Sequence, residues 1–147
     1  MMDQKGYPAR MTDMDDFNKQ VIEEFRTNDG KVGGMFEGAP MVLLTTTGAR
    51  SGQPRIAPLV YTTDSDRLVI IASKGGAPTH PDWYHNIAAN PDVTVEVGTE
   101  KYQARAEIAT EPERTRLFNA QADIMPNFYE YQKNTDRTIP VITISRA

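Results

Sequence analysis

Two short segments that alternate apolar and polar residues, with three residues between them, constrain the fold of this chain most. From Asp92 to Gly98 valine occupies every second position, and from Tyr102 to Ala109 apolar residues do so again. Side chains on a β-strand alternate between its faces, so this spacing predicts two strands with one buried face each. Because Thr99–Glu100 has room for a tight turn only, we expect an antiparallel pair.

Further strands are predicted from runs of aliphatic and β-branched residues that are bounded by Gly, Pro, Asp and Ser. They cover residues 40–47, 55–63, 67–73 and 139–145, with turns at 48–54 and 64–66. Within the third run, Leu68–Ala72 is almost wholly apolar, which is typical of a strand buried on both faces.

The first predicted helix, Thr12–Thr27, is amphipathic. Its apolar side consists of Met14, Phe17, Val21, Ile22 and Phe25. We expect it to pack on the domain. A position on a membrane surface is the alternative, which the acidic residues of the same helix oppose.

Two more helices are predicted after the middle of the chain. A short one is expected to begin at a capping box of Thr79 and Asp82 and to stop at Asn90–Pro91. A longer one covers residues 111–125 and is expected to begin at a capping box of Thr110 and Glu113. Its predicted inward side chains are Leu117, Phe118, Ala122 and Met125.

This order of elements predicts the α+β class with a small closed or split β-barrel. Roughly six strands, mostly antiparallel and joined mostly by short turns, are flanked by helices at one end and along one side. A doubly wound parallel sheet would need a helix after each strand. The length of 147 residues suggests one domain, residues 12–147, after a flexible leader, residues 1–11.

Composition excludes several classes of protein. The chain has no cysteine and two histidines without an HExxH pattern, so neither disulfides nor a metal centre are expected. A net charge of −4 argues against nucleic-acid binding. No apolar run approaches the roughly 20 residues of a membrane span, and no signal-peptide region is apparent, so we expect a cytoplasmic protein.

Positive charge is concentrated in the middle third. Residues 38–63 contain no acidic residue but include Arg50 and Arg55, and residues 67–81 again contain none but include Lys74. This distribution favours a small anionic ligand over a polyanion, which needs a wider basic face. The alternative is that the two arginines are only the solvated ends of a hairpin.

The segment Ser73–Gly76 follows the most apolar strand and contains a hydroxyl, an ammonium group and two glycines, so it is a candidate anion site. On the helix that follows, Trp83, Asn86 and Ile87 share a face. That face either points toward a ligand held by the loop or packs into the core.

Three blocks of sequence together resemble the deazaflavin-dependent nitroreductase family, actinobacterial reductases that use coenzyme F420, an 8-hydroxy-5-deazaflavin. The blocks are LLTTTGARSGQPRIAPL, ASKGGAPTHPDWYHNIAANPDVTVEVG and YQKNTDRTIPV, in the family's order and near its spacing. The resemblance implies a split β-barrel related to FMN-binding flavoproteins. It also implies a cytoplasmic or membrane-peripheral enzyme that is often a homodimer.

The resemblance also implies the residues of the coenzyme site. Phosphate and tail would be held by Arg50, Ser51, Gly52, Arg55, Lys74 and Gly75. The deazaflavin would be lined by Ile71, Ala72, Ser73, Trp83, Tyr84 and Asn86.

In this family the reduced coenzyme passes a hydride to an electron-poor acceptor, which can be a quinone, an activated enone or a nitroaromatic. Ser73 and Tyr131 are the candidates for the polar contact to the acceptor. Nitro-reducing members tend to have tyrosines where this chain has Val60, Phe128 and a residue near Met125, and only Tyr131 matches. Nitroimidazole reduction is therefore not expected to be efficient.

Two other functions stay open at this stage. The first is an FMN-binding reductase of the related barrel superfamily, and the second is a non-catalytic carrier of the deazaflavin or of a lipophilic ligand. Binding of the two coenzymes and turnover with acceptors distinguish them.

Overall fold

The fold was analysed in a computed structural model that describes Met11 to Ala147, with side chains from Asp16 onward except that of Met35. Residues 1–10, most of the predicted leader, lie outside the described part. The helices are α1 (Met11–Thr27), η1 (Gly34–Phe36), η2 (Lys74–Gly76), α2 (Asp82–Ala89), α3 (Glu113–Ile124) and α4 (Asn127–Lys133). The strands are β1 (Met41–Thr47), β2 (Pro54–Val60), β3 (Thr62–Asp64), β4 (Arg67–Ile71), β5 (Asp92–Val97), β6 (Glu100–Ile108) and β7 (Val141–Arg146).

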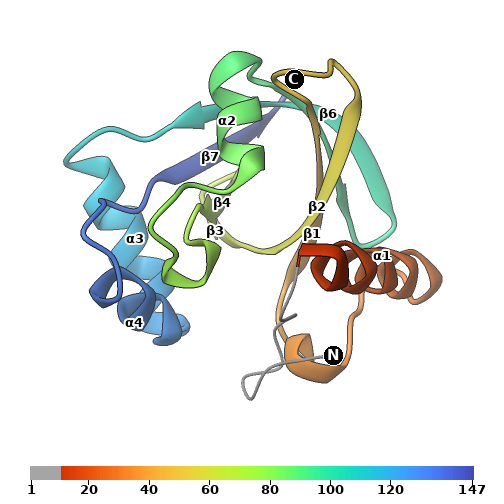
Figure 1. The fold of residues 1–147 in the computed structure, drawn as a ribbon, viewed down its shortest axis with the longest axis horizontal. Helices are drawn as coiled ribbons and strands as arrows, with labels where there is room; N and C mark the ends of the chain where they lie inside the picture. Colours follow the sequence, from red (N-terminus) through yellow and green to blue (C-terminus); the bar gives the residue numbers. More distant parts are fainter. Residues whose placement is uncertain (1–10) are drawn as a thin grey trace.

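All seven strands form one antiparallel sheet in the order β2-β1-β5-β6-β7-β4-β3 (Figure 1). The two edge strands, β2 and β3, are consecutive in the chain, so the sheet curls and its edges approach each other. The predicted α+β split barrel is confirmed. The predicted hairpins are also present, with Val97 opposite Glu100 and Asp64 opposite Arg67.

The sheet contains one strand more than the sequence predicted, because residues 55–63 do not form a single strand. The N–H of Tyr61 donates to the carbonyl of Pro40, with an N···O distance of 3.1 Å. The chain before Tyr61 pairs with β1, and the chain after it pairs with β4. The break therefore follows from a contact 21 positions away in sequence and not from a local turn signal.

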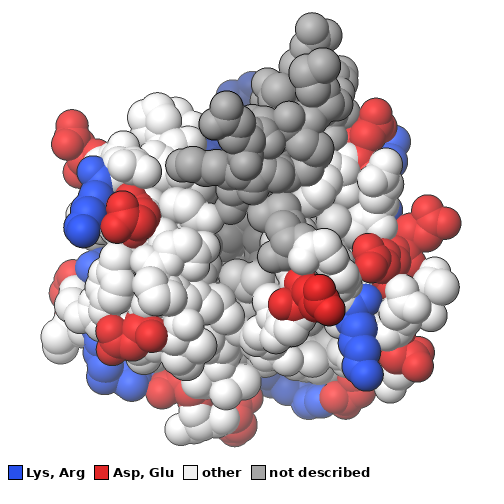
Figure 2. Space-filling model, turned by 90° about the horizontal axis from the view of Figure 1, so that it is seen from below, with Lys and Arg blue, Asp and Glu red and all other residues white. Residues whose placement is uncertain are grey.

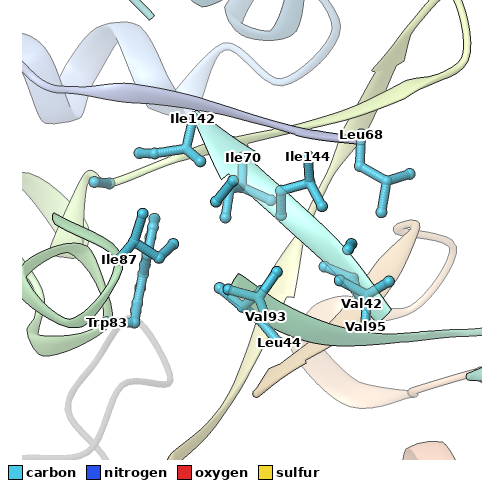
Figure 3. Close-up of a cluster of buried hydrophobic side chains, with 13 residues drawn as sticks. Val42, Leu44, Leu68, Ile70, Trp83, Ile87, Val93, Val95, Ile142 and Ile144 are labelled. Atoms are coloured by element: carbon cyan, nitrogen blue, oxygen red, sulfur yellow. The ribbon is translucent and has the colours of Figure 1, made fainter. Parts of the chain in front are cut away.

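The main core lies inside the curled sheet. Leu68, Ile70, Ile142 and Ile144 from β4 and β7 face Val42, Leu44, Val93 and Val95 from β1 and β5 (Figure 3). Trp83 and Ile87 of α2 pack against one end of this cluster. The alternating apolar residues of β5 and β6 face it as predicted, so this alternation identifies the inner face of the sheet.

Helices cover the outer faces of two strands. Val69 and Ile71 of β4 pack under α3 and α4 with Leu117, Phe118 and Phe128. This explains why the apolar run of β4 is buried on both faces.

The outer face of β1 carries Met41 and Leu43, which pack against Val21 and Phe25 of α1. The predicted N-terminal helix is thus packed on the domain, although the side chain of Met14 lies outside the described part. No described helix is long and apolar enough to cross a membrane.

Both predicted capping boxes are wrong. α2 begins after Pro81 without a side-chain cap, and the Thr79 hydroxyl accepts a hydrogen bond from Lys74 instead. α3 likewise begins after Pro112 without a side-chain cap at that position. There the Glu111 carboxylate accepts the N–H of Thr115 at 2.8 Å.

Candidate functional site

The turn between β1 and β2, residues 48–53, contains the first group of predicted binding residues. It is closed by backbone hydrogen bonds from Gly48 N–H to Gln53 O and from Gly52 N–H to Gly48 O, at 2.8 and 2.9 Å. Gly52 has a φ of +71°, which favours glycine. The Ser51 hydroxyl accepts from the N–H of Gln53, so it supports the turn itself.

Two arginines, Arg50 in this turn and Arg55 near the start of β2, project outward. Arg50 and Arg55 are exposed, and neither has an ion-pair or hydrogen-bond partner among the described side chains. Their charges are therefore available to an anion. The exposure of the two arginines also agrees with the alternative that they are only solvated ends of a hairpin.

The second group of predicted residues lies on the loop after β4. Lys74, Gly75 and Gly76 all have positive φ, at 48°, 64° and 85°. The N–H groups of Gly76 and Ala77 donate to Ser73 O and Lys74 O and close a tight 3₁₀ turn. Because these N–H groups are used inside the turn, the exposed ammonium of Lys74 is the loop's main feature for an anion.

α2 connects the two loops. The second loop leads into its first turn, and the buried Asn86 in its middle is bonded to the first loop. Asn86 Oδ1 accepts from the N–H of Ala49 at 2.9 Å, and its Nδ2 donates to the Thr46 hydroxyl at 3.0 Å. Sequence reasoning placed Asn86 against the coenzyme ring. In the structure its amide positions the loop that carries Arg50.

The other two predicted ring contacts on α2 differ from each other in exposure. Trp83 is 9% exposed and belongs to the main core, whereas Tyr84 is half-buried and stacks on His80 with ring centroids 4.5 Å apart. The alternative in which Trp83 packs into the core therefore agrees with its burial, and its contact with a coenzyme stays a prediction.

The residues predicted for the acceptor pocket share one hydrophobic cluster. Phe128 is buried in the cluster beneath α3 and α4, and Val60, Met125 and Tyr131 are half-buried residues that pack against this cluster. The rings of Phe128 and Tyr131 meet edge to face with centroids 5.5 Å apart, and the Tyr131 hydroxyl accepts from Asn127 Nδ2 at 3.0 Å. Tyr61, the residue after Val60, lies between β2 and β3 and packs against the main core instead.

The acceptor cluster and the Lys74 loop are in direct contact. A Cβ on Gly76 would lie 2.8 Å from the carbonyl oxygen of Tyr131, so only glycine allows the loop to approach α4 this closely. Residues 55 positions apart in sequence thus meet, the Lys74 loop through Gly76 and α4 through the backbone of Tyr131.

Sequence reasoning missed Arg137, which follows α4 and donates hydrogen bonds to the carbonyls of the Lys74 loop. The residue lies in the third of the quoted blocks, but no local pattern marks it as a loop-holding group. The described residues contain no cluster of three or more histidine, aspartate or glutamate side chains that could hold a metal.

Comparison with known proteins places the chain in a family. The family described as F420H(2)-dependent quinone reductase matches residues 17–145. This chain belongs to that family. It is 41% identical over 126 residues to the F420H(2)-dependent quinone reductase Rv1261c of Mycobacterium tuberculosis, which covers 83% of this chain and 85% of the relative. It is 35% identical over 111 residues to the putative F420H(2)-dependent quinone reductase Rv3178 of Mycobacterium tuberculosis. This match covers 76% of this chain and 93% of the relative.

Solved structures agree with this assignment. A structure of an F420-H2 dependent reductase, FDR-A, is 40% identical, has a TM-score of 0.66, and covers 72% of this chain and 94% of its own. A structure titled a domain-swapped dimer is 37% identical and has a TM-score of 0.68. The match covers 92% of this chain and 100% of that structure's chain. HutZ, the heme storage protein of Vibrio cholerae, has a TM-score of 0.57 at 12% identity over 88% of this chain and 90% of its own, which shows a shared fold alone.

The residues present fit a coenzyme of the F420 type. Its phosphate and glutamate tail need fixed cations outside an apolar slot, and two loops joined by α2 supply exposed Arg50, Arg55 and Lys74. Figure 2, which shows the molecule from below, has acidic and basic side chains interspersed with uncharged surface over the described residues.

Proposed function

We propose that this chain reduces quinones with reduced coenzyme F420, and that the two loops joined by α2 hold the coenzyme beside the cluster around Phe128. The observation that carries the proposal is the contact between Gly76 and Tyr131. Through it the loop that carries Lys74 lies against α4, the helix that carries the predicted acceptor residues Phe128 and Tyr131.

On the coenzyme side, we expect Arg50 and Arg55 to bind phosphate or carboxylate oxygens. An arginine grips such an anion with two parallel hydrogen bonds, whereas Lys74 acts as a single point charge. Asn86 contributes indirectly, because its amide fixes the backbone beside Arg50. Ser51 and Gly52 stabilise the turn that carries Arg50. Ile71 and Ala72 are buried apolar residues directly before the Lys74 loop.

The bound coenzyme supplies a hydride from its C5 carbon and disfavours one-electron transfer. The protein's part is to hold the acceptor carbon at near-attack distance, to exclude water and to donate a hydrogen bond where negative charge develops. We expect Ser73 or Tyr131 to donate that hydrogen bond. The half-buried Tyr131 hydroxyl, whose position Asn127 supports, is the stronger candidate.

The acceptor wall favours a flat apolar ring. Val60 and Met125 are half-buried and Phe128 is buried, and none of them offers a hydroxyl. A buried hydrogen bond left unmade costs about 1–3 kcal/mol, enough to favour a naphthoquinone over a bicyclic nitroimidazole by tenfold or more.

A homodimer is part of this proposal. It is supported by the relative at 37% identity whose structure is titled a domain-swapped dimer. Light scattering at several protein concentrations tests it. Peripheral membrane contact stays a prediction, and co-sedimentation with anionic lipid vesicles tests that.

Fluorescence titration with F420 and with FMN, followed by an acceptor panel with reduced F420, tests the function. We expect F420 to bind and reduced F420 to be oxidised by menadione, seen as the return of the deazaflavin absorbance. Binding of FMN alone would identify the flavin enzyme. Binding of F420 without turnover on any acceptor would identify the carrier.

A further inference from the structure

Arg137 makes an unusual set of contacts for a residue between two elements of secondary structure. Its Nε donates to the carbonyl of Ala77 at 2.9 Å, its Nη2 to that of Ser73 at 2.7 Å and its Nη1 to that of Ala72 at 3.2 Å. Its guanidinium thus binds three backbone carbonyls of a segment that lies 60 to 65 positions earlier in sequence.

These carbonyls flank the strained part of the loop. Lys74 has a φ of 48°, which costs a non-glycine residue free energy unless its surroundings hold it there. Arg137 fixes the backbone on both sides of that residue. A lysine could not replace it, because one ammonium lacks the planar fork of donors that reaches three acceptors in fixed directions.

The Nη1 of Arg137 has a second partner, His80. The distance from Nη1 to Nδ1 of the imidazole is 2.9 Å. A guanidinium only donates hydrogen bonds, so Nδ1 must accept, and the imidazole must be neutral with its hydrogen on Nε2. Burial, the charge of Arg137 and then His85 lower the pKa of His80, in agreement with this state.

The groups around His80 come from three elements. Arg137 faces it from the segment after α4, and the rings of Tyr84 and His85 on α2 lie 4.5 and 5.8 Å from its own. On the segment that contains His80, the preceding residue, Thr79, accepts a hydrogen bond from Lys74. Asp82 lies two positions after His80. The positive charge of Arg137 therefore opposes a second proton on the His80 ring.

We infer that Arg137 is a positioning residue for the coenzyme loop, and that its hold on the loop requires a neutral His80. The inference rests on the proposed function, because it assigns Arg137 and His80 to the same coenzyme site. When His80 gains a proton, its Nδ1 becomes a donor that faces another donor. The imidazolium and guanidinium then repel each other, and the carbonyls of residues 72–77 lose part of their support.

Four variants test the inference. Arg137→Gln and Arg137→Lys remove the fork of donors. His80→Asn places an amide oxygen near the position of Nδ1, so the acceptor is kept but cannot be protonated. His85→Asn is the matched control, because His85 is exposed and is not bonded to Arg137 among the described residues.

The measurement is F420 affinity by fluorescence titration between pH 5.5 and 8.5. Dividing each Kd by the wild-type value at the same pH cancels the titration of the coenzyme itself. We expect both Arg137 variants to bind about tenfold more weakly at pH 8, the loss of roughly one charge-assisted hydrogen bond. His80→Asn should match the wild type at pH 8 and bind progressively tighter than it toward pH 5.5. His85→Asn should keep the loss of affinity at low pH, with only a small shift of that loss to higher pH, because His85 is the smallest of the three causes that lower the pKa of His80.

Amide hydrogen exchange of residues 72–79 without coenzyme separates this inference from the proposed function. Protection should fall in Arg137→Gln at every pH, and in the wild type but not in His80→Asn as the pH falls. Failure of the wild type to bind F420 would overturn the proposed function, while exchange would still test the loop contact. Unchanged protection in Arg137→Gln, or a Kd ratio for His80→Asn that stays constant with pH, would overturn the inference.

Discussion

At the scale of single residues, we expect the exposed cations without carboxylate partners among the described residues to contribute to the affinity for an anionic coenzyme. We expect Arg55→Ala and Lys74→Ala each to weaken F420 binding by about 1.5–3 kcal/mol, the value of a lost hydrogen bond between charged groups. The fold should be unaffected, since both side chains are exposed. Fluorescence titration at low and high salt checks this, and the affinity should fall with salt.

Lys101→Ala is the matched control for these two variants, because Lys101 is an exposed lysine on β6. Its removal should leave F420 affinity unchanged. Equal affinity in Arg55→Ala, Lys74→Ala and the wild type would contradict the assignment of these loops to the coenzyme.

The second residue-scale prediction concerns the acceptor wall. Phe128 is 4% exposed and lies edge to face with Tyr131. Phe128→Tyr should raise nitroimidazole reduction relative to quinone reduction, because it adds a donor to a dry pocket. Tyr131→Phe should lower turnover of both acceptors if its hydroxyl supports the developing charge. Steady-state kinetics with one quinone and one nitroimidazole measure both effects.

Tyr129→Phe serves as the control, since the Tyr129 hydroxyl donates to Asp123 on the exposed side of α3. It should leave both activities unchanged. Efficient nitroimidazole turnover by the wild type, insensitive to Phe128→Tyr and Tyr131→Phe, would overturn the pocket assignment and leave the coenzyme site unaffected.

At the scale of elements, α2 carries two buried side chains with different contacts. Trp83 packs in the main core, and Asn86 is bonded to the turn that carries Arg50. Trp83→Ala should destabilise the protein by about 3–5 kcal/mol, since a large side chain leaves the main core. Asn86→Ala should cost less, about 1–3 kcal/mol, because it leaves the Ala49 N–H and the Thr46 hydroxyl without their partner. Urea denaturation of the two variants measures this order.

The two substitutions should also differ in function. Asn86→Ala releases the turn that carries Arg50, so F420 affinity should fall even where the protein is folded. Asn90→Ala is the control on the same segment, because Asn90 Oδ1 accepts only from the nearby N–H of Asp92 among the described residues. Equal stability losses in Trp83→Ala and Asn86→Ala, with F420 affinity unchanged in both, would make α2 purely structural.

The elements also show what sequence reasoning can and cannot reach. The alternation at Val93, Val95 and Val97 depends only on strand geometry, so it predicted the buried face correctly. The predicted capping boxes failed because each helix begins after a proline two residues beyond the predicted cap, and the Thr79 hydroxyl accepts from Lys74 instead. The loop-holding roles of Asn86 and Arg137 depend on backbone groups 37 to 65 positions away, which only the folded chain brings near them.

At the scale of the whole molecule, an ion network ties the outer helix layer to the sheet. Asp64, at the turn between β3 and β4, accepts hydrogen bonds from Arg67 on β4 and from Arg116 on α3. Arg67 also pairs with Glu113 at the start of α3, at 3.3 Å. The hydrogen bonds from Arg116 and then Arg67 lower the pKa of Asp64 from 3.8 to about 2.

This lowered pKa predicts a pH dependence of stability with a defined sign. The native state holds the Asp64 proton more weakly than the unfolded state, so its contribution is complete above pH 3.8 and is lost as the pH falls toward 2. The melting temperature of Asp64→Asn should therefore lie below that of the wild type at pH 6, and the gap should close by pH 2. Asp92→Asn is the control, because its pair with Arg105 is more than two-thirds exposed on both sides and contributes little at any pH. A gap between Asp64→Asn and the wild type that persists at pH 2, or an equal gap for Asp92→Asn at pH 6, would show that the network does not hold α3 to the sheet through this carboxylate.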